Sequence, residues 1–180
     1  MKIIAFGAST SKTSINKYFA THTANQFDGC DVTVLDLNDY DLPVYSIDLE
    51  NESGVPENAK RFYNDLQSAD LLIISMAEHN GYYTAAFKNL HDWVSRHEMK
   101  MFAGAKMILL STSPGVNGAM TARDAAFSKF PYSGSEIIAT FSLPNFEENL
   151  KDKDQIQDEK LKAEFEKMIA DVKQKCNIDD

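Results

Sequence analysis

The stretch Leu71-Leu72-Ile73-Ile74-Ser75-Met76 decides the fold, because it is short, apolar and shows almost no polar alternation. A run of this kind is typical of a parallel strand that is buried on both faces of its sheet. Similar strand-length runs occupy residues 2–6, 32–37 and 107–111, and a weaker one occupies residues 137–141. The sequence therefore predicts five strands.

Helical segments separate these runs. Apolar residues three and four positions apart mark helices near residues 15–19, 56–66 and 87–94, and a shorter one at residues 119–130. Strand–helix alternation of this kind predicts a doubly wound α/β sheet with helices on both faces. No composition shift or linker divides the chain, so we expect one domain over residues 1–180.

The C-terminal helix is the clearest of all. Its apolar stripe runs from Leu161 to Val172, and Lys, Glu and Asp fill the other positions. We expect residues 146–154 to form a solvated loop before it, with an N-cap near Asp152 or Asp154.

Composition limits the function classes. The 18 basic and 27 acidic residues give a net charge of −9, which disfavours nucleic acid and anionic membrane surfaces as partners. No apolar run approaches the roughly 18 residues of a membrane span, so a soluble, cytoplasmic protein is expected. Cys30 and Cys176 are too few for a disulfide scaffold or a thiolate metal site, and no metal site is predicted.

Three loops carry the candidate functional residues. Residues 7–14, 77–83 and 112–118 follow the first, third and fourth strands and are rich in hydroxyl groups, Gly and Asn. The carboxyl ends of parallel strands meet at one edge of a sheet, and ligands bind there. We therefore expect the three loops to form one composite site.

The first loop has the character of an anion cradle. Five of the six residues 9–14 carry a hydroxyl, and they lead directly into a helix at Ile15. Hydroxyl groups and free N–H groups at a helix N-terminus favour a phosphate, and Lys12 is the single cation of the loop. The alternative interpretation is an ordinary N-cap preceded by a polar loop.

Several familiar motifs are absent. The sequence has neither Gly-x-x-x-x-Gly-Lys-Ser/Thr nor Gly-x-Gly-x-x-Gly, which disfavours a nucleotide hydrolase and an ordinary dinucleotide site. A serine hydrolase is a weak alternative, because none of the four histidines lies in the last third of the chain. His91 and His97 are six residues apart and do not share a helix face, which disfavours a metal site between them.

Three blocks of the sequence are informative when they are taken together. The most specific block is Ala77-Glu78-His79-Asn80-Gly81 with Phe87-Lys88-Asn89-Leu90-His91-Asp92-Trp93. The other two are Ala8-Ser9-Thr10-Ser11-Lys12-Thr13-Ser14-Ile15-Asn16 in the first loop and Ser113-Pro114-Gly115-Val116-Asn117-Gly118-Ala119 in the third. Together these blocks resemble those of the NAD(P)H-dependent FMN reductases, a flavodoxin-like group that includes quinone, azo and chromate reductases. The resemblance covers all but the C-terminal tail.

The resemblance implies a flavodoxin-like three-layer sandwich with a five-stranded parallel sheet in the order 2-1-3-4-5. It also implies FMN as cofactor, NADPH or NADH as hydride donor, a quinone, free flavin or similar small molecule as electron acceptor, and a homodimer or homotetramer. The flavin would perform the chemistry, so no catalytic side chain is expected. The implied FMN-binding residues are Ser9, Ser11, Ser14, Ile15 and Asn16 around the phosphate, Glu78, His79, Asn80 and Gly81 at one edge of the ring, and Ser113, Gly115 and Gly118 at the other.

Three departures from the family pattern stand in these blocks. Ser11 replaces an Arg that many members carry, Ala77 replaces Pro, and His79 replaces Tyr. Glu78 is expected to act through its main chain more than through its charge. Two other functions stay open: a flavodoxin-type electron carrier that binds FMN without oxidising NAD(P)H, and a phosphate-binding scaffold without redox chemistry.

Overall fold

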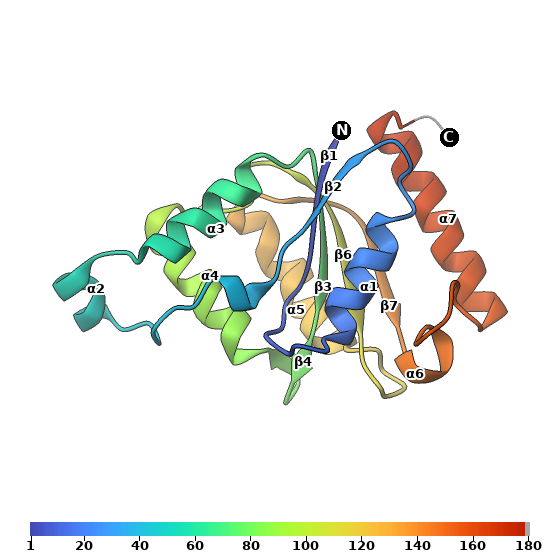
Figure 1. Ribbon diagram of the computed structural model, residues 1–180, viewed down its shortest axis with the longest axis horizontal. Coiled ribbons are helices and arrows are strands. Elements are labelled where there is room, and N and C mark those ends of the chain that lie inside the picture. The colour runs from blue at the N-terminus through green and yellow to red at the C-terminus, as the bar shows by residue number, and fades with distance from the viewer. Residues whose placement is uncertain (179–180) are drawn as a thin grey trace.

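The computed structural model describes residues 1–178. Its five-stranded parallel sheet has the order β2-β1-β3-β6-β7 (Figure 1), which confirms the predicted order 2-1-3-4-5 once two short hairpin strands are set aside. Ile138 is an extra residue in β7, because Met107 pairs with Ile137 and Ile108 with Ala139. The strands are β1 (Lys2–Gly7), β2 (Asp31–Val34), β3 (Leu71–Met76), β6 (Lys106–Thr112) and β7 (Glu136–Leu143).

Helices cover both faces of the sheet. One layer holds α3 (Glu57–Gln67), α4 (Ala85–His97) and α5 (Met120–Lys129), and the other holds α1 (Ile15–Ala24) and α7 (Glu159–Cys176) (Figure 1). The remaining helices are α2 (Ile47–Ser53), α6 (Phe146–Asn149) and the short 3₁₀ turns Leu37–Asp39 and Phe130–Ser133.

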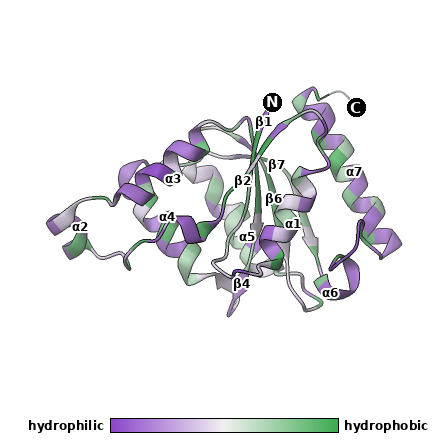
Figure 2. Cartoon of the chain, in the orientation of Figure 1, coloured by the Kyte–Doolittle hydropathy of each residue, from purple (hydrophilic) through white to green (hydrophobic). Residues whose placement is uncertain are grey.

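Successive strand residues pack into two cores, one on each side of the sheet. In β3, Leu72 and Ile74 belong to the core under α3, α4 and α5, whereas Leu71 and Ile73 belong to the core under α1 and α7. All six residues of β3 are buried, which explains why its sequence lacks polar alternation. Figure 2 shows the same arrangement, with largely hydrophobic strands between helices that carry hydrophilic residues.

The helix α7 completes the second core. The ring of Phe165 lies 6.0 Å from that of Phe19 on α1 and 5.5 Å from that of Phe141 on β7, measured between centroids. Ile169 and Val172 are buried beside it. The predicted apolar stripe of this helix is therefore the surface that covers α1 and β7.

Two expectations about the chain near this helix are wrong. Residues 146–154 are not a solvated loop, because Phe146 and Leu150 are 3% and 0% exposed, and Phe146 packs edge-on against Tyr18 at 5.6 Å. The N-cap of α7 is Asp158, whose side chain accepts a hydrogen bond from the N–H of Leu161, and neither Asp152 nor Asp154 takes that place.

The second strand is also shorter than predicted. It ends at Val34, because the side chain of Asp36 accepts a hydrogen bond from the N–H of Asn38 at 2.9 Å and starts a 3₁₀ turn. The chain then leaves the sheet as an arm that carries α2 (Figure 1). Trp93 Nε1 donates to the carbonyl of Pro43, and Arg96 pairs with Glu50, so α4 holds this arm in place.

Candidate functional site

The loops after β1, β3 and β6 meet at one edge of the sheet, the lower edge in Figure 1, and enclose a cavity of about 250 Å³. This cavity brings together residues of all three loops, and the outermost of them, Ser9 and Pro114, are 105 positions apart in sequence. Its lining residues are Ser9, Ser11, Thr13, Ser14, Ile15, Asn16, Ala77, Glu78, His79, Thr112, Ser113 and Pro114. The predicted residues Asn80, Gly81, Gly115 and Gly118 lie outside this lining.

The N-terminus of α1 faces this cavity with free donors. Ser14 is the N-cap, and its Oγ accepts a hydrogen bond from the N–H of Lys17 at 3.1 Å. The N–H groups of Ile15 and Asn16 have no acceptor within residues 1–178. Free N–H groups together with the helix dipole make this end of α1 a suitable place for an anion.

Neither Lys12 nor Lys17 lines this cavity. Lys17 Nζ turns to Asp36, at 2.5 Å, and this hydrogen bond lowers the pKa of the Asp36 carboxyl below its usual value. Lys12 is exposed, and within the described chain it forms no ion pair. The donors that line this cavity are therefore neutral N–H and hydroxyl groups.

The side chain of Asn16 connects the three loops. It is 4% exposed. Its Nδ2 donates to the carbonyl of Thr112 at 3.1 Å, and its Oδ1 accepts from the N–H of Thr112 at 3.1 Å and from Ser75 Oγ at 2.7 Å. Only the main-chain N–H of Asn16 is thus available to a ligand, and the amide ties α1 to β3 and β6.

The second loop is a β-hairpin. The strands β4 (Glu78–His79) and β5 (Tyr82–Tyr83) are antiparallel, and Asn80 and Gly81 form the turn with φ of 52° and 78°. Two successive positive φ values are those of a type I′ turn, for which Asn-Gly is the preferred sequence. Asn80 and Gly81 are exposed at the tip, which is why they do not line the cavity. The Asn-Gly pair is the sequence signal from which this hairpin could have been predicted.

The carboxylate of Glu78 has a specific partner. Its Oε2 accepts a hydrogen bond from the N–H of Ala122, in the first turn of α5, at 3.1 Å. The residue before α5, Ala119, is left-handed with φ of 59° and offers no side-chain cap. Glu78 therefore does more than the main-chain role expected of it, because its side chain satisfies a donor of another helix.

The third loop is fastened to the end of β7. The carbonyl of Gly115 accepts from the N–H of Asn145 at 3.1 Å. A Cβ at Gly118 would lie 2.9 Å from the nitrogen of Pro144, so this position needs glycine for close packing of two chain segments. Of the predicted residues in this loop, Ser113 faces the cavity.

No cluster of three His, Cys, Asp or Glu side chains suited to a metal is present within residues 1–178. His91 is stacked on Phe130, its Nε2 lies 3.2 Å from Ser133 Oγ, and burial lowers the pKa of its imidazole. His79 is exposed on the hairpin.

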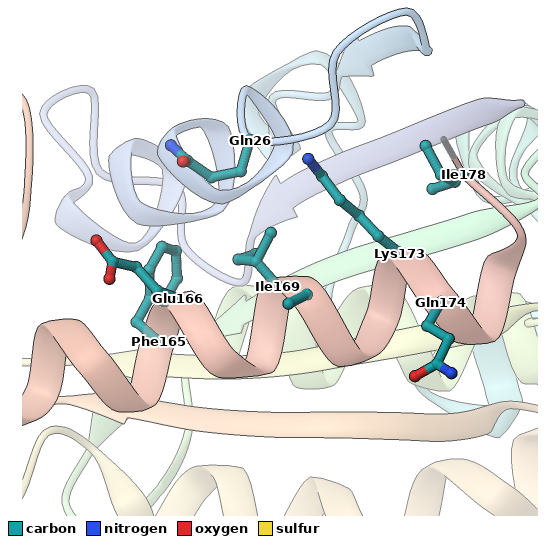
Figure 3. A pocket seen from close by; sticks show the side chains of 8 residues that line it. Gln26, Phe165, Glu166, Ile169, Lys173, Gln174 and Ile178 are labelled. Carbon is teal, nitrogen blue, oxygen red and sulfur yellow. The ribbon is translucent and has the colours of Figure 1, made fainter. Parts of the chain in front are cut away.

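Two further cavities lie on the α1 side of the sheet. One of about 800 Å³ shares Thr13, Ser14 and Ile15 with the site and extends between α1 and α6. Another, of about 360 Å³, lies between α7 and the end of α1; Figure 3 shows Phe165 and Ile169 pointing from α7 toward the segment that carries Gln26. The second is remote from the carboxyl edge of the sheet.

These features define a parallel α/β sheet whose carboxyl edge carries the free N–H groups of Ile15 and Asn16 and a β-hairpin. Residues 1–148 match the model of a family described as NADPH-dependent FMN reductase, so the chain belongs to that family, and the resemblance noted in the sequence is confirmed. Within residues 1–178, no helix has both the length and the hydropathy that a membrane span requires.

Known relatives are similar over part of their length. The chain is 31% identical over 78 residues to a quinone reductase of Escherichia coli (strain K12), a match that covers 43% of this chain and 42% of that protein. It is 34% identical over 86 residues to a quinone reductase of Pseudomonas putida, covering 47% of this chain and 46% of that protein. The matched segments thus span less than half of each of these two relatives.

Solved structures show the same fold over nearly the whole chain. FerB, a flavoenzyme NAD(P)H:(acceptor) oxidoreductase from Paracoccus denitrificans, has a TM-score of 0.70 and 23% identity, covering 96% of this chain and 97% of that one. An azoreductase from Bacillus anthracis str. Sterne has a TM-score of 0.67 and 16% identity, covering 97% of this chain and 99% of that one. At these identities the likeness concerns the fold alone.

Proposed function

We propose that this protein is an FMN-dependent oxidoreductase that takes hydride from NADPH or NADH and passes electrons to a quinone, free flavin or similar small acceptor. The observation that carries the proposal is the pair of free N–H groups of Ile15 and Asn16, which face a cavity in a chain of the FMN reductase family. Relatives named as quinone reductases support the acceptor class.

The donor set of the cavity fits a singly phosphorylated ligand. Neutral N–H and hydroxyl donors at a helix N-terminus suit a phosphate monoester, and Ser9, Ser11 and Ser14 supply hydroxyls beside the two free N–H groups. In this proposal, the ring would lie between the β4–β5 hairpin and the loop that carries Ser113 and Gly115. Gly118 would contribute by holding that loop against β7.

When bound, the flavin would supply the redox chemistry by accepting hydride and releasing electrons to the acceptor. The residues of this chain would bind and orient it. The cradle would fix the phosphate, and the main chain of residues 78–81 would border the polar edge of the ring. The exposed side chains of His79 and Tyr82 lie on the same hairpin and are positioned to contact the donor or the acceptor.

An anaerobic titration tests the proposal. The purified protein is loaded with FMN, NADPH or NADH is added under argon, and the flavin absorbance is followed. Rapid bleaching supports the reductase. A loaded protein that does not bleach would favour the flavodoxin-type carrier, and a protein that takes up no FMN would favour a phosphate-binding scaffold.

A charge placed in the cradle gives a sharper test. Asp is as good an N-cap as Ser, so Ser14→Asp keeps the cap of α1 while it sets a negative charge where the phosphate would bind. We expect FMN affinity to fall tenfold or more and riboflavin affinity to stay nearly unchanged. Ser46→Asp is the matched control, because Ser46 caps α2 in the same way and lies on the arm. Equal effects of the two variants on FMN would refute the placement of the phosphate.

The proposal includes the assembly and location of the protein. Residues 1–180 would form one FMN-binding domain. A location in the cytoplasm is supported by the free thiols of Cys30 and Cys176, which suit a reducing compartment. The proposal assigns a homodimer or homotetramer, supported by the apolar side chains of Val44 and Ile47, which are 83% and 53% exposed on the arm. Light scattering after size-exclusion chromatography measures the assembly, and a monomer at micromolar concentration would contradict it.

A further inference from the structure

The β4–β5 hairpin depends on contacts outside itself. Each of its strands has two residues, and a hairpin of that size is not stable alone in water. At its C-terminal end, Thr84 Oγ1 donates to the carbonyl of Ala8 at 2.9 Å, which ties it to the first loop. On its N-terminal strand, the tie is the hydrogen bond between Glu78 Oε2 and the N–H of Ala122. The tip, Asn80 and Gly81, is exposed.

The helix α5 supplies a place for the Glu78 carboxylate. Its N-cap residue is Ala119, its first turn contains no acidic side chain, and no side chain of its own caps it. A helix N-terminus carries unsatisfied N–H groups and a partial positive charge, so a carboxylate stabilises it. Glu78 comes from 44 residues away in the sequence, and the bond therefore connects the hairpin, which borders the cavity, to the N-terminus of α5.

The strand register of the hairpin gives a second reason to expect that Glu78 holds the hairpin in place. Glu78 pairs with Tyr83 across the hairpin, and Tyr83 is 7% exposed and packs against Phe87 and Phe130. Residues directly opposite each other on two strands project to one side of a hairpin. Glu78 and Tyr83 are thus the two more buried residues of the hairpin, whereas His79 and Tyr82 are exposed, the ring of Tyr82 lying on that of Tyr83 with centroids 4.4 Å apart.

We propose that Glu78 is a positioning residue whose carboxylate clamps the β4–β5 hairpin to the N-terminus of α5 and so fixes the main chain of residues 78–81 at the ring edge of the site. The consequence for flavin binding rests on the proposed function. The clamp itself does not, because it is a property of the protein without ligand.

Hydrogen exchange of the ligand-free protein tests the clamp directly. In Glu78→Ala, we expect the N–H of Ala122 and the N–H groups of the hairpin to exchange tenfold faster or more, since hydrogen bonds to charged groups are the stronger ones. Glu78→Gln retains an acceptor oxygen without the charge and should show a smaller increase. If Glu78→Ala leaves these exchange rates within twofold of the wild-type rates, the clamp is refuted.

Tyr83→Phe is the matched control in the same hairpin. Tyr83 Oη is buried and has no hydrogen-bond partner within residues 1–178. Its removal takes no hydrogen bond from the hairpin, so exchange at Ala122 should stay as in the wild type. Acceleration equal to that of Glu78→Ala would mean that any change in the hairpin loosens α5, and the specific role of the carboxylate would be lost.

Flavin binding then tests the consequence for the site. Fluorescence quenching gives the dissociation constants of FMN and riboflavin, which differ by the phosphate. Because Glu78 acts on the ring side, Glu78→Ala should weaken both ligands by the same factor, about threefold to tenfold, with Glu78→Gln between it and the wild type. A loss confined to FMN, or no loss for either ligand, would overturn the positioning role.

The two assays separate the two proposals. If the wild-type protein binds no flavin, the proposed function fails and the exchange comparison alone decides on the clamp. If flavin binds and Glu78→Ala changes neither exchange nor affinity, the clamp fails and the proposed function stands.

Discussion

Replacing Asn16 by Ala should destabilise the fold at the point where the three site loops meet. The Asn16 side chain is almost fully buried and makes hydrogen bonds with the N–H and the carbonyl of Thr112 and with the hydroxyl of Ser75. Ala at this position leaves all three groups without that partner. Ser75 can rotate its hydroxyl, whereas the main-chain groups of Thr112 have no comparable freedom.

The magnitude follows from those two main-chain groups. Each buried polar group left unsatisfied costs about 1–3 kcal/mol, which gives roughly 2–6 kcal/mol for the pair. The space vacated by the amide is lined by polar atoms and can admit a water molecule, which recovers part of the loss. We therefore expect Asn16→Ala to lower the free energy of unfolding by about 2–4 kcal/mol.

Equilibrium unfolding in urea measures this value. Trp93 is the sole tryptophan of the sequence and is fully buried, so its fluorescence reports unfolding. Asn58→Ala is the control, because Asn58 is half-buried and its side chain donates one hydrogen bond, to the carbonyl of Asp41; its effect should stay within about 1 kcal/mol. An unchanged m-value with a loss below about 1 kcal/mol in Asn16→Ala would refute the reasoning.

Three further predictions concern local features. Gly7→Ala should lower the free energy of unfolding in urea by about 1–3 kcal/mol or more, because a Cβ at this position would overlap the backbone nitrogen of Lys17. A variant as stable as the wild type would contradict the close approach of α1 to β1. Ser14→Ala removes the N-cap of α1 and should lower the free energy of unfolding by about 1 kcal/mol, seen as a lower melting temperature; an unchanged melting temperature would argue against the cap. Burial lowers the pKa of the His91 imidazole below its usual value of 6.5. The unfolded chain therefore takes up a proton on His91 at a higher pH than the folded protein does. As a result, the free energy of unfolding should fall as the pH drops below about 6.5. His91→Gln should reduce this loss of stability between about pH 7.5 and 5.5, and His22, whose pKa burial also lowers, accounts for part of what remains. If the free energy of unfolding has the same slope against pH in the variant and the wild type, the prediction is wrong.

The sheet and its main helices could be predicted because their signals are local. Leu71–Met76 is apolar at nearly every position, and only a strand buried on both faces explains such a run in an α/β chain. The hydroxyl residues before Ile15 predicted the start of α1 and the hydroxyl and N–H donors at its N-terminus. The three loops followed from topology, since parallel strands end at one edge.

Elements that bury little, or that depend on distant partners, were not predictable in this way. No residue of α2 is buried, so no apolar periodicity marks it, and the strands of the hairpin are too short to show one. Phe146 and Leu150 are buried because they join the core on the α1 and α7 side of the sheet, which the local sequence does not reveal.

The side-chain hydrogen bonds within the site could not be predicted from the sequence for the same reason. Asn16 and Thr112 are 96 residues apart, and Glu78 and Ala122 are 44 apart. A hydrogen bond between two such residues exists only once the strands have placed their loops together. Residue type can therefore suggest that Asn16 and Glu78 belong to a site, but the fold determines which of their atoms remain available to a ligand.

The cover that α7 provides has a consequence for synthesis of the chain. Ribosomes add about 5–20 residues per second, so residues 144–176 take roughly 2–7 s after β7 is complete. During that interval Phe19 and Phe141 lack the ring of Phe165 that shields them in the finished molecule. A nascent polypeptide in which α7 has not yet docked is therefore less protected against aggregation than the finished protein.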